Sequence, residues 1–157
     1  MLLEYLLIAF ISMIPIVELR GAVPIGIGMG LHPILTILIC VIGNMLPVPI
    51  IYIFARKFLL WGSKQKFIGK FCGFFIRKGE KASAKLLSNK NKYGTIIALM
   101  LFVAIPLPAT GAWTGTLGAS FLGLDFKTTC ISVMCGVIIA GIIMAIITTC
   151  GLHIFGF

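Results

Sequence analysis

Three long stretches of the 157-residue chain contain no charged residue, and they dominate its hydropathy pattern. They cover residues 21–55, 93–124 and 128–157. A helix needs about 20 apolar residues to cross a bilayer, so the third stretch predicts one transmembrane helix over residues 128–149. The first two stretches are too long for one helix and rather short for two. Both are also interrupted by proline and glycine.

These interruptions occur in the same way in both halves of the chain. Residues 5–17 and 93–105 are apolar segments of 13 residues, a length more typical of half-helices or re-entrant segments than of full spans. An Ile-Pro dipeptide and a following Gly-Ala pair accompany each of them. A long apolar segment then follows, over residues 34–55 and 128–149. The pattern predicts two repeats, each a re-entrant helical hairpin plus a transmembrane helix. A plain bundle of proline-kinked helices is the alternative.

Matching broken helices in two halves are the best sequence sign of a transport site. Non-helical backbone is tolerated at membrane depth only where protein buries it or where it lines a watery cavity. We therefore expect the two hairpin tips to meet near the middle of the membrane.

Positive charge is concentrated in one segment between the two halves. Residues 56–92 hold 11 of the 13 Lys and Arg residues and have a net charge of +10, whereas the other 120 residues have a net charge of −1. A short basic loop beside apolar spans marks the cytoplasmic side. The first long helix therefore runs inward and the last runs outward, so the two repeats are inverted. The chain is one membrane domain: residues 1–55, a basic linker over 56–92, and residues 93–157.

Composition supports a membrane protein. The chain is 60% apolar and only 11% charged, against about 25% charged residues in a soluble domain. Within the linker, Phe67, Phe71 and Phe74 fall on one helical face, which predicts an amphipathic helix lying on anionic lipids of the cytoplasmic leaflet. The basic excess is thus assigned to topology and lipid contact, and nucleic acid is not expected as a partner.

Sequence patterns of an enzyme, a metal site or a cofactor site are not found. The five cysteines form no CxxC motif or Cys/His cluster, and we interpret them as packing residues. The chain contains no Walker A motif and no Ser-His-Asp set. Its glycines at positions 26, 28 and 30 belong to a hairpin rather than to a nucleotide loop. We therefore expect neither enzymatic activity nor a cofactor.

Glu18 and Arg20 are the outstanding candidates for a site, because they stand between apolar segments in a proline- and glycine-rich passage. Ionisable residues at membrane depth are costly and usually mark a substrate or proton pathway. Glu18 can take up a proton or a cationic substrate, and Arg20 can hold a phosphate through its planar guanidinium. The structural alternative is that the two charges tie the loop together.

The remaining candidates are polar, proline or glycine residues near the two interruptions. Half-helix N-termini in the second interruption would offer free N–H groups to an anion, while small residues there can simply pack helices together. Trp113 either faces a substrate or lies in the core. Asn44 is expected to hydrogen-bond across to a hairpin or to contact substrate. The full set is Pro24, Asn44, Pro106, Pro108, Thr110, Gly111, Trp113 and Thr114.

Two motifs resemble those of a known family. The segments are ELRGAVP at residues 18–24 and PLPATGAWTG at residues 106–115. They resemble the motifs of the putative small multi-drug export protein family, and the likeness extends over nearly the whole chain. The chain departs from the pattern at Ala109, where glycine is expected. The resemblance implies a role in drug export.

A more distant similarity links the chain to the DedA membrane proteins, whose paired re-entrant hairpins form inverted repeats. That similarity implies an alternative role in moving a lipid-carrier phosphate across the membrane. The arginine that DedA proteins carry in their second hairpin has no counterpart in residues 106–121, which weakens the transfer of a two-arginine phosphate site.

Together these features predict an all-α integral protein of the bacterial cytoplasmic (inner) membrane. We expect a small secondary transporter that exports small molecules by alternating access. A flippase for an anionic lipid such as a polyprenyl phosphate, and a non-transporting membrane scaffold, are the alternatives. Because a chain of this size has little interior, we also expect a homodimer.

Overall fold

All regular elements of the described chain are α-helices. The computed structural model describes residues 2–63, 77, 92–107 and 110–155. The predicted amphipathic helix of the linker therefore lies outside the described residues, as do Pro108 and Ala109. The helices are α1 (Leu2–Met13), α2 (Glu18–Gly28), α3 (Pro33–Met45), α4 (Pro47–Gly62), α6 (Lys92–Ala104), α7 (Ala112–Phe121) and α8 (Phe126–Phe155).

Two helical segments are long and apolar enough to cross a membrane. They are Pro33–Phe58, which joins α3 to most of α4, and Phe126–Leu152 within α8. Large apolar side chains are exposed along nearly every described helix, whereas soluble monomers rarely expose large contiguous apolar patches. The all-helical prediction is confirmed, and both the surface and the two long helices are those expected of a membrane protein.

The first long apolar segment is broken where its prolines predict a bend. Leu46 separates α3 from α4, and α4 begins at Pro47, whose ring nitrogen cannot donate to the carbonyl four residues earlier. The predicted end of this helix at Ala55 was too early, because α4 continues to Gly62. No proline or glycine between Pro49 and Gly62 ends the helix earlier. Basic side chains near a helix end extend toward water, so the helix continues past the apolar stretch.

Each half of the chain begins with two short helices separated by a break. The first break covers residues 14–17, since α2 already begins at Glu18. It is shorter than the breaker-rich sequence of residues 14–26 indicates, because Pro24 lies inside α2 and removes only one backbone hydrogen bond there. The second break lies between Ala104 and Ala112. The order of short helix, break, short helix and long helix thus occurs twice.

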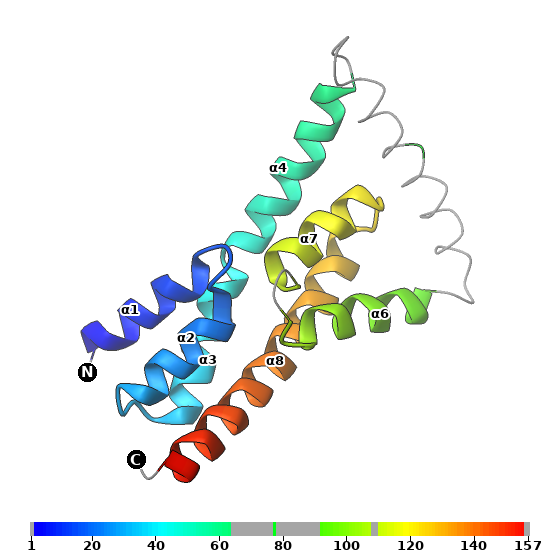
Figure 1. Ribbon diagram of the computed structural model, residues 1–157. Coiled ribbons are helices and arrows are strands. Elements are labelled where there is room, and N and C mark those ends of the chain that lie inside the picture. The colour runs from blue at the N-terminus through cyan, green and yellow to red at the C-terminus, as the bar shows by residue number, and fades with distance from the viewer. Residues whose placement is uncertain (1, 64–76, 78–91, 108–109, 156–157) are drawn as a thin grey trace.

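The second short helix of each half packs against a long helix of the other half as well as one of its own. Helix α1 packs against α3, and α6 packs against α8, so each first helix lies on the long helix of its own half. Helix α2 packs against α8 as well as α3, and α7 packs against α4 as well as α8. The path through α3 and α4 runs in the opposite direction to α8 (Figure 1).

Glycine allows the same close approach in both halves. A Cβ at residue 43 would lie 2.5 Å from the carbonyl oxygen of Ala9, and a Cβ at residue 136 would lie 2.7 Å from that of Met100. Ala9 and Met100 each stand six positions before the first proline of the break that follows. Small residues permit helix backbones to pack closely in membranes, and here they place α1 on α3 and α6 on α8.

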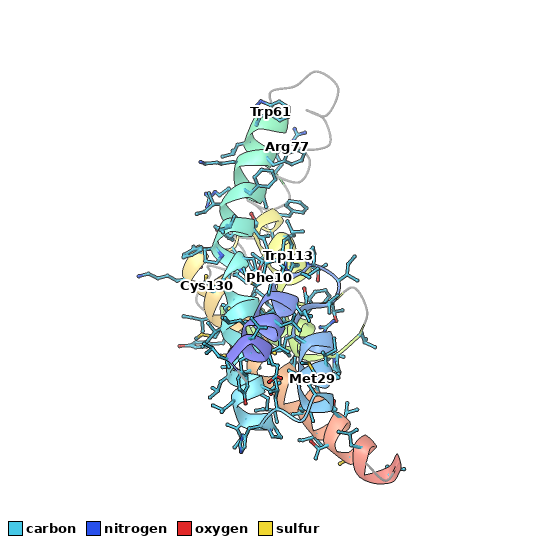
Figure 2. The ribbon with its side chains drawn as sticks, turned by 90° about the vertical axis from the view of Figure 1, so that its left-hand side faces the viewer. Phe10, Met29, Trp61, Arg77, Trp113 and Cys130 are labelled. Carbon is cyan, nitrogen blue, oxygen red and sulfur yellow. The ribbon has the colours of Figure 1, made fainter. Side chains whose placement is uncertain are left out.

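The molecule is elongated, and its two tryptophans mark different levels along it. Trp61 lies at one end, whereas Trp113 lies near the middle (Figure 2). On α4, the rings of Phe54, Phe58 and Trp61 follow one another with centroids 6.4 Å apart, and all three are exposed. Exposed aromatic rings next to basic residues are typical of the membrane–water interface.

Candidate functional site

A cavity lies where the two breaks meet, with a volume of about 640 Å³. One wall comes from the first break and the start of α2, and the other from the second break and α7. Trp113, on this second wall, lies near the middle of the molecule's length (Figure 2). The lining residues are Pro15, Ile16, Val17, Glu18, Arg20, Gly21, Pro106, Leu107, Thr110, Trp113, Thr114 and Leu117.

Glu18 caps the helix on the opposite wall of the cavity. It is only 6% exposed, and its Oε1 accepts a hydrogen bond of 3.1 Å from the backbone N–H of Trp113 in the first turn of α7. The first N–H groups of a helix have no partner within it and carry a partial positive charge. The Trp113 N–H, which we expected to be free for a bound anion, is therefore already taken by the carboxylate of Glu18. Glu18 has a φ of +49°, in the left-handed region that non-glycine residues rarely adopt.

Gly111 makes room for this carboxylate. A Cβ at residue 111 would overlap Oε2 of Glu18, and it would lie 2.7 Å from the carboxyl carbon. The φ of Gly111 is 163°, an extended conformation that any residue adopts. The requirement for glycine is therefore one of space, because a side chain at this position would displace the carboxylate from the α7 N-terminus.

Arg20 binds the end of the other short helix of the second half. Its guanidinium donates to the carbonyl oxygens of Val103 at 3.2 Å and Ile105 at 3.0 Å, and also to that of Leu107. The last carbonyls of a helix lack partners within it and carry a partial negative charge. Arg20 thus neutralises the C-terminal end of α6, while Glu18 neutralises the N-terminal start of α7.

Glu18 and Arg20 together therefore tie the second break to α2. The sequence presented two roles for these charges, a site for substrate or protons and a structural tie within their own loop. In the structure the two charges do form a structural link, but it joins α2 to the backbone of the other half and not to their own loop. Because the same two residues also line the cavity, the tie does not remove them from contact with a bound molecule.

Two threonines, Thr110 in the second break and Thr114 in the first turn of α7, mainly hold the local backbone shape. The Thr110 hydroxyl lies 2.9 Å from the carbonyl oxygen of Ile105 and 2.8 Å from that of Leu107. The Thr114 hydroxyl donates more weakly to the Gly111 carbonyl, at 3.4 Å. Both residues line the cavity, so they contribute shape and a polar edge.

Two proline candidates are placed differently by the fold. Pro106 lines the cavity from the second break. Pro24 lies inside α2 and is not among the lining residues. It shapes the helix that carries Glu18 and Arg20 rather than the cavity wall itself.

Trp113 forms part of the cavity wall but is not fully exposed to it. Its side chain is half-buried, and its indole Nε1 is buried with no hydrogen-bond partner among the described residues. Since its backbone N–H is the group that Glu18 binds, any movement of Trp113 is coupled to the position of that carboxylate.

Asn44 lines a void beside Glu18, and its side-chain oxygen makes no hydrogen bond to a described residue of either hairpin. The residue is 2% exposed, and its Oδ1 has no partner within the described part of the chain. It lines a second, much smaller void of about 10 Å³ together with Glu18, Arg20 and Gly111. The hydrogen bond predicted from Asn44 to a hairpin has no counterpart at this oxygen within the described residues, and a contact with substrate stays a prediction.

Sequence analysis missed Tyr52, which holds the connection between α7 and α8. Its hydroxyl donates a hydrogen bond of 2.6 Å to the carbonyl oxygen of Leu124. Its ring packs edge-on against Phe126, with centroids 5.3 Å apart, and its own carbonyl accepts from Ser120 at 3.4 Å. A tyrosine within an apolar stretch was the available signal, because a buried hydroxyl usually has a partner.

The lining of the cavity favours the binding of a partly apolar molecule. Most of the cavity lining is apolar, and its two charges already rest on backbone groups. Within the described residues, His, Cys, Asp and Glu side chains form no cluster that could hold a metal ion. A small molecule with an apolar body and one charged group matches such a cavity.

Comparison with known proteins assigns the chain to a family. The family model described as putative small multi-drug export protein matches residues 18–143. The match begins at the first residue of α2, covers both walls of the cavity and ends within α8. No curated protein and no solved structure matches the chain.

Proposed function

The chain belongs to the putative small multi-drug export protein family, and on that premise we propose that it is a small secondary transporter that exports lipophilic cations. Transport occurs by alternating access to the cavity between the two breaks. The protein spans the cytoplasmic membrane of a bacterium several times and works as a homodimer.

The cavity itself is the observation that carries this proposal. Its volume of about 640 Å³ lies within the range of roughly 300–1,000 Å³ found for small-molecule sites. Its walls are mainly apolar, and Glu18 places a buried carboxylate in them. An apolar cation satisfies both features, because it buries its hydrocarbon against the walls and offers a positive charge to the carboxylate.

The state of Arg20 favours this substrate class over an anionic lipid. A phosphate clamp needs guanidinium N–H groups that are free to bind bidentately. In the structure, NH1 and NH2 of Arg20 already donate to three backbone carbonyls. Binding a phosphate would require those carbonyls to be released at membrane depth, where unpaired backbone groups are costly.

Exchange at Glu18 supplies the coupling in the proposed cycle. The carboxylate binds either a proton or the substrate cation, and release of one allows binding of the other. Because Glu18 also contacts the start of α7, binding of a proton or cation to Glu18 changes the position of α6 and α7, the second pair of short helices. Alternating exposure then follows from movement of the two pairs against the long helices.

An inverted repeat of two re-entrant hairpins is the proposed architecture for this movement. The short helices contain 10–13 residues each, or about 15–20 Å at 1.5 Å per residue, which is less than the roughly 30 Å of a bilayer core. The packing of α2 and α7 against long helices of the other half and the matching glycine contacts at residues 43 and 136 support the repeat. The end with Trp61 faces the cytoplasm.

Reconstitution in liposomes tests the proposed function. Purified full-length protein is incorporated, a pH gradient is imposed, and movement of a fluorescent lipophilic cation is recorded beside that of a polyprenyl phosphate. We expect the cation to move, and Glu18→Gln to abolish this movement. Glu4→Gln is the matched control, since Glu4 lies in α1 and does not line the cavity.

The same assay separates the alternatives. Movement of the polyprenyl phosphate without the cation would replace the exporter by a lipid flippase. If neither compound moves, and neither binds in a way that depends on Glu18 or Arg20, the protein is a membrane scaffold.

A further inference from the structure

Two residues with side-chain oxygens, Glu18 and Asn44, line one small void beside the proposed transport cavity. The void measures about 10 Å³. Asn44 is 98% buried, and its Oδ1 has no partner among the described residues. A buried, unpaired carbonyl oxygen normally costs stability, so its position next to a carboxyl group calls for an explanation.

The surroundings of the void limit what can occupy it. Arg20, from the same helix as Glu18, is the other charged group in its lining. Helices α6, α7 and α8 contribute Val103, Ala112, Val137 and Ala140, and the second break contributes Gly111, none of which titrates. A metal cation takes several oxygen ligands, but the lining side chains offer oxygen only from Glu18 and Asn44, with a guanidinium beside them.

A proton on Glu18 satisfies these constraints without needing further space. An ionised carboxylate can only accept hydrogen bonds, and so can the amide oxygen of Asn44, whereas a protonated carboxyl group has an O–H to donate. We propose that Asn44 is a positioning residue for the coupling proton, and that its Oδ1 accepts a hydrogen bond from protonated Glu18.

This hydrogen bond defines the second of two states for Glu18. In the ionised state the carboxylate holds the N-terminus of α7 through Trp113, and the oxygen of Asn44 is unpaired. In the protonated state Asn44 gains a partner, and the charge that favours the α7 N-terminus is lost. The inference rests on the proposed function, because it assigns the coupling ion and one of its contacts in the same site.

Infrared difference spectroscopy tests the hydrogen bond directly. The chain has only four Asp and Glu residues, so individual carboxyl bands can be assigned by substitution. Full-length protein in liposomes is taken from high to low pH, and the C=O stretch of protonated carboxyl groups is recorded. We expect one band that disappears in Glu18→Gln and shifts to higher frequency in Asn44→Leu, because the carboxyl O–H then has no acceptor.

Two further variants control for packing. Asn44→Ala removes the same oxygen without added bulk and is expected to produce a shift in the same direction, including where the leucine variant fails to fold. Thr36→Val removes another buried and unpartnered oxygen of α3 that does not line the void, and it is expected to leave the band in place.

The outcomes distinguish this inference from the proposed function. An unshifted band in both Asn44 variants overturns the role of Asn44, even where transport depends on Glu18. Movement of the ionised carboxylate band alone also overturns it, since Asn44 would then be a donor. Absence of any Glu18-dependent protonation over the pH range in which transport occurs overturns both the Asn44 role and coupling at Glu18.

Discussion

The carboxylate of Glu18 occupies the space that a side chain at residue 111 would fill, and residue 111 is glycine. This relationship joins the two halves of the chain, because Glu18 begins α2 and Gly111 immediately precedes α7. It places the single buried acid of the described cavity wall against a helix N-terminus of the other half.

Adding one methyl group at residue 111 is expected to displace the Glu18 carboxylate. Overpacking of this kind costs about 1–3 kcal/mol, and Gly111→Ala should reduce cation transport as strongly as Glu18→Gln does. Gly118→Ala is the control on the same helix, because a Cβ there meets nothing within 4 Å. Thermal unfolding in detergent and uptake into liposomes provide the two measurements. Equal behaviour of the two alanine variants would contradict the close contact.

Removing only the charge of Glu18 is expected to separate function from folding. In Glu18→Gln the amide oxygen can still accept the Trp113 N–H, so the lost stability is limited to the charge–dipole contribution of about 0.3–1 kcal/mol. Transport driven by a pH gradient should nevertheless disappear. The melting temperature and the initial rate of uptake are measured on the same preparations, and pH-dependent uptake at the normal rate would exclude Glu18 as the coupling group.

Arg20 is expected to be irreplaceable by lysine. The guanidinium reaches one carbonyl at the end of α6 and two in the second break, and an ammonium group lacks the planar fork needed for that geometry. Arg20→Lys should therefore destabilise the protein by about 1–3 kcal/mol. Arg56→Lys on α4, where the arginine makes one long contact of 3.4 Å to Tyr52, should change stability by less than about 0.5 kcal/mol. Similar melting temperatures for the two variants would argue against the tie.

Loss of the Tyr52 hydroxyl is expected to loosen the connection between α7 and α8. Tyr52→Phe leaves the Leu124 carbonyl without its 2.6 Å partner and should cost about 1–3 kcal/mol, while the ring contact with Phe126 stays. Hydrogen exchange should accelerate around residues 121–125 before it does within α8. The exposed Tyr93 provides the control substitution, and equal exchange in both variants would contradict the anchoring role.

The proposed orientation can be read from cysteine labelling in intact cells. In a cysteine-free background, Met29→Cys at the α2–α3 turn should react with a membrane-impermeant maleimide from outside. Ser63→Cys, just beyond α4, should react only after permeabilisation, because the basic segment stays in the cytoplasm. The reverse labelling pattern would invert the topology and the direction assigned to both hairpins.

Hydropathy and helix breakers predicted the positions of the helices more successfully than the contacts between them. The break at Pro47, the short apolar helices and α8 follow from local residue types, whose effects on the backbone are local. The start of α2 at Glu18 was harder to predict from the sequence, because a helix can contain a proline such as Pro24 at the loss of one hydrogen bond.

The partners of the candidate charges depended on information that a single sequence does not carry. Arg20 binds backbone carbonyls, and every residue offers one, so no side chain marks Val103 or Ile105 as acceptors. The isolation of Glu18 and Arg20 in an apolar sequence still identified the two charged residues that line the cavity. Gly111 was a candidate for its small size, but its reason, the overlap with Glu18, required the tertiary structure.

Filling the cavity without touching its charges tests the central claim most directly. Leu117 lines the cavity and lies far from Glu18 and Arg20 in the sequence. The substitution Leu117→Trp adds bulk to the space assigned to substrate. The measurement is uptake of a lipophilic cation into liposomes under a pH gradient, with the melting temperature recorded in parallel. We predict that wild-type protein transports the cation and that the folded Leu117→Trp protein does so at least about tenfold more slowly, a barrier difference of roughly 1.4 kcal/mol. Uptake by the variant at the wild-type rate, or no uptake by either protein, would contradict a transport site between the two breaks.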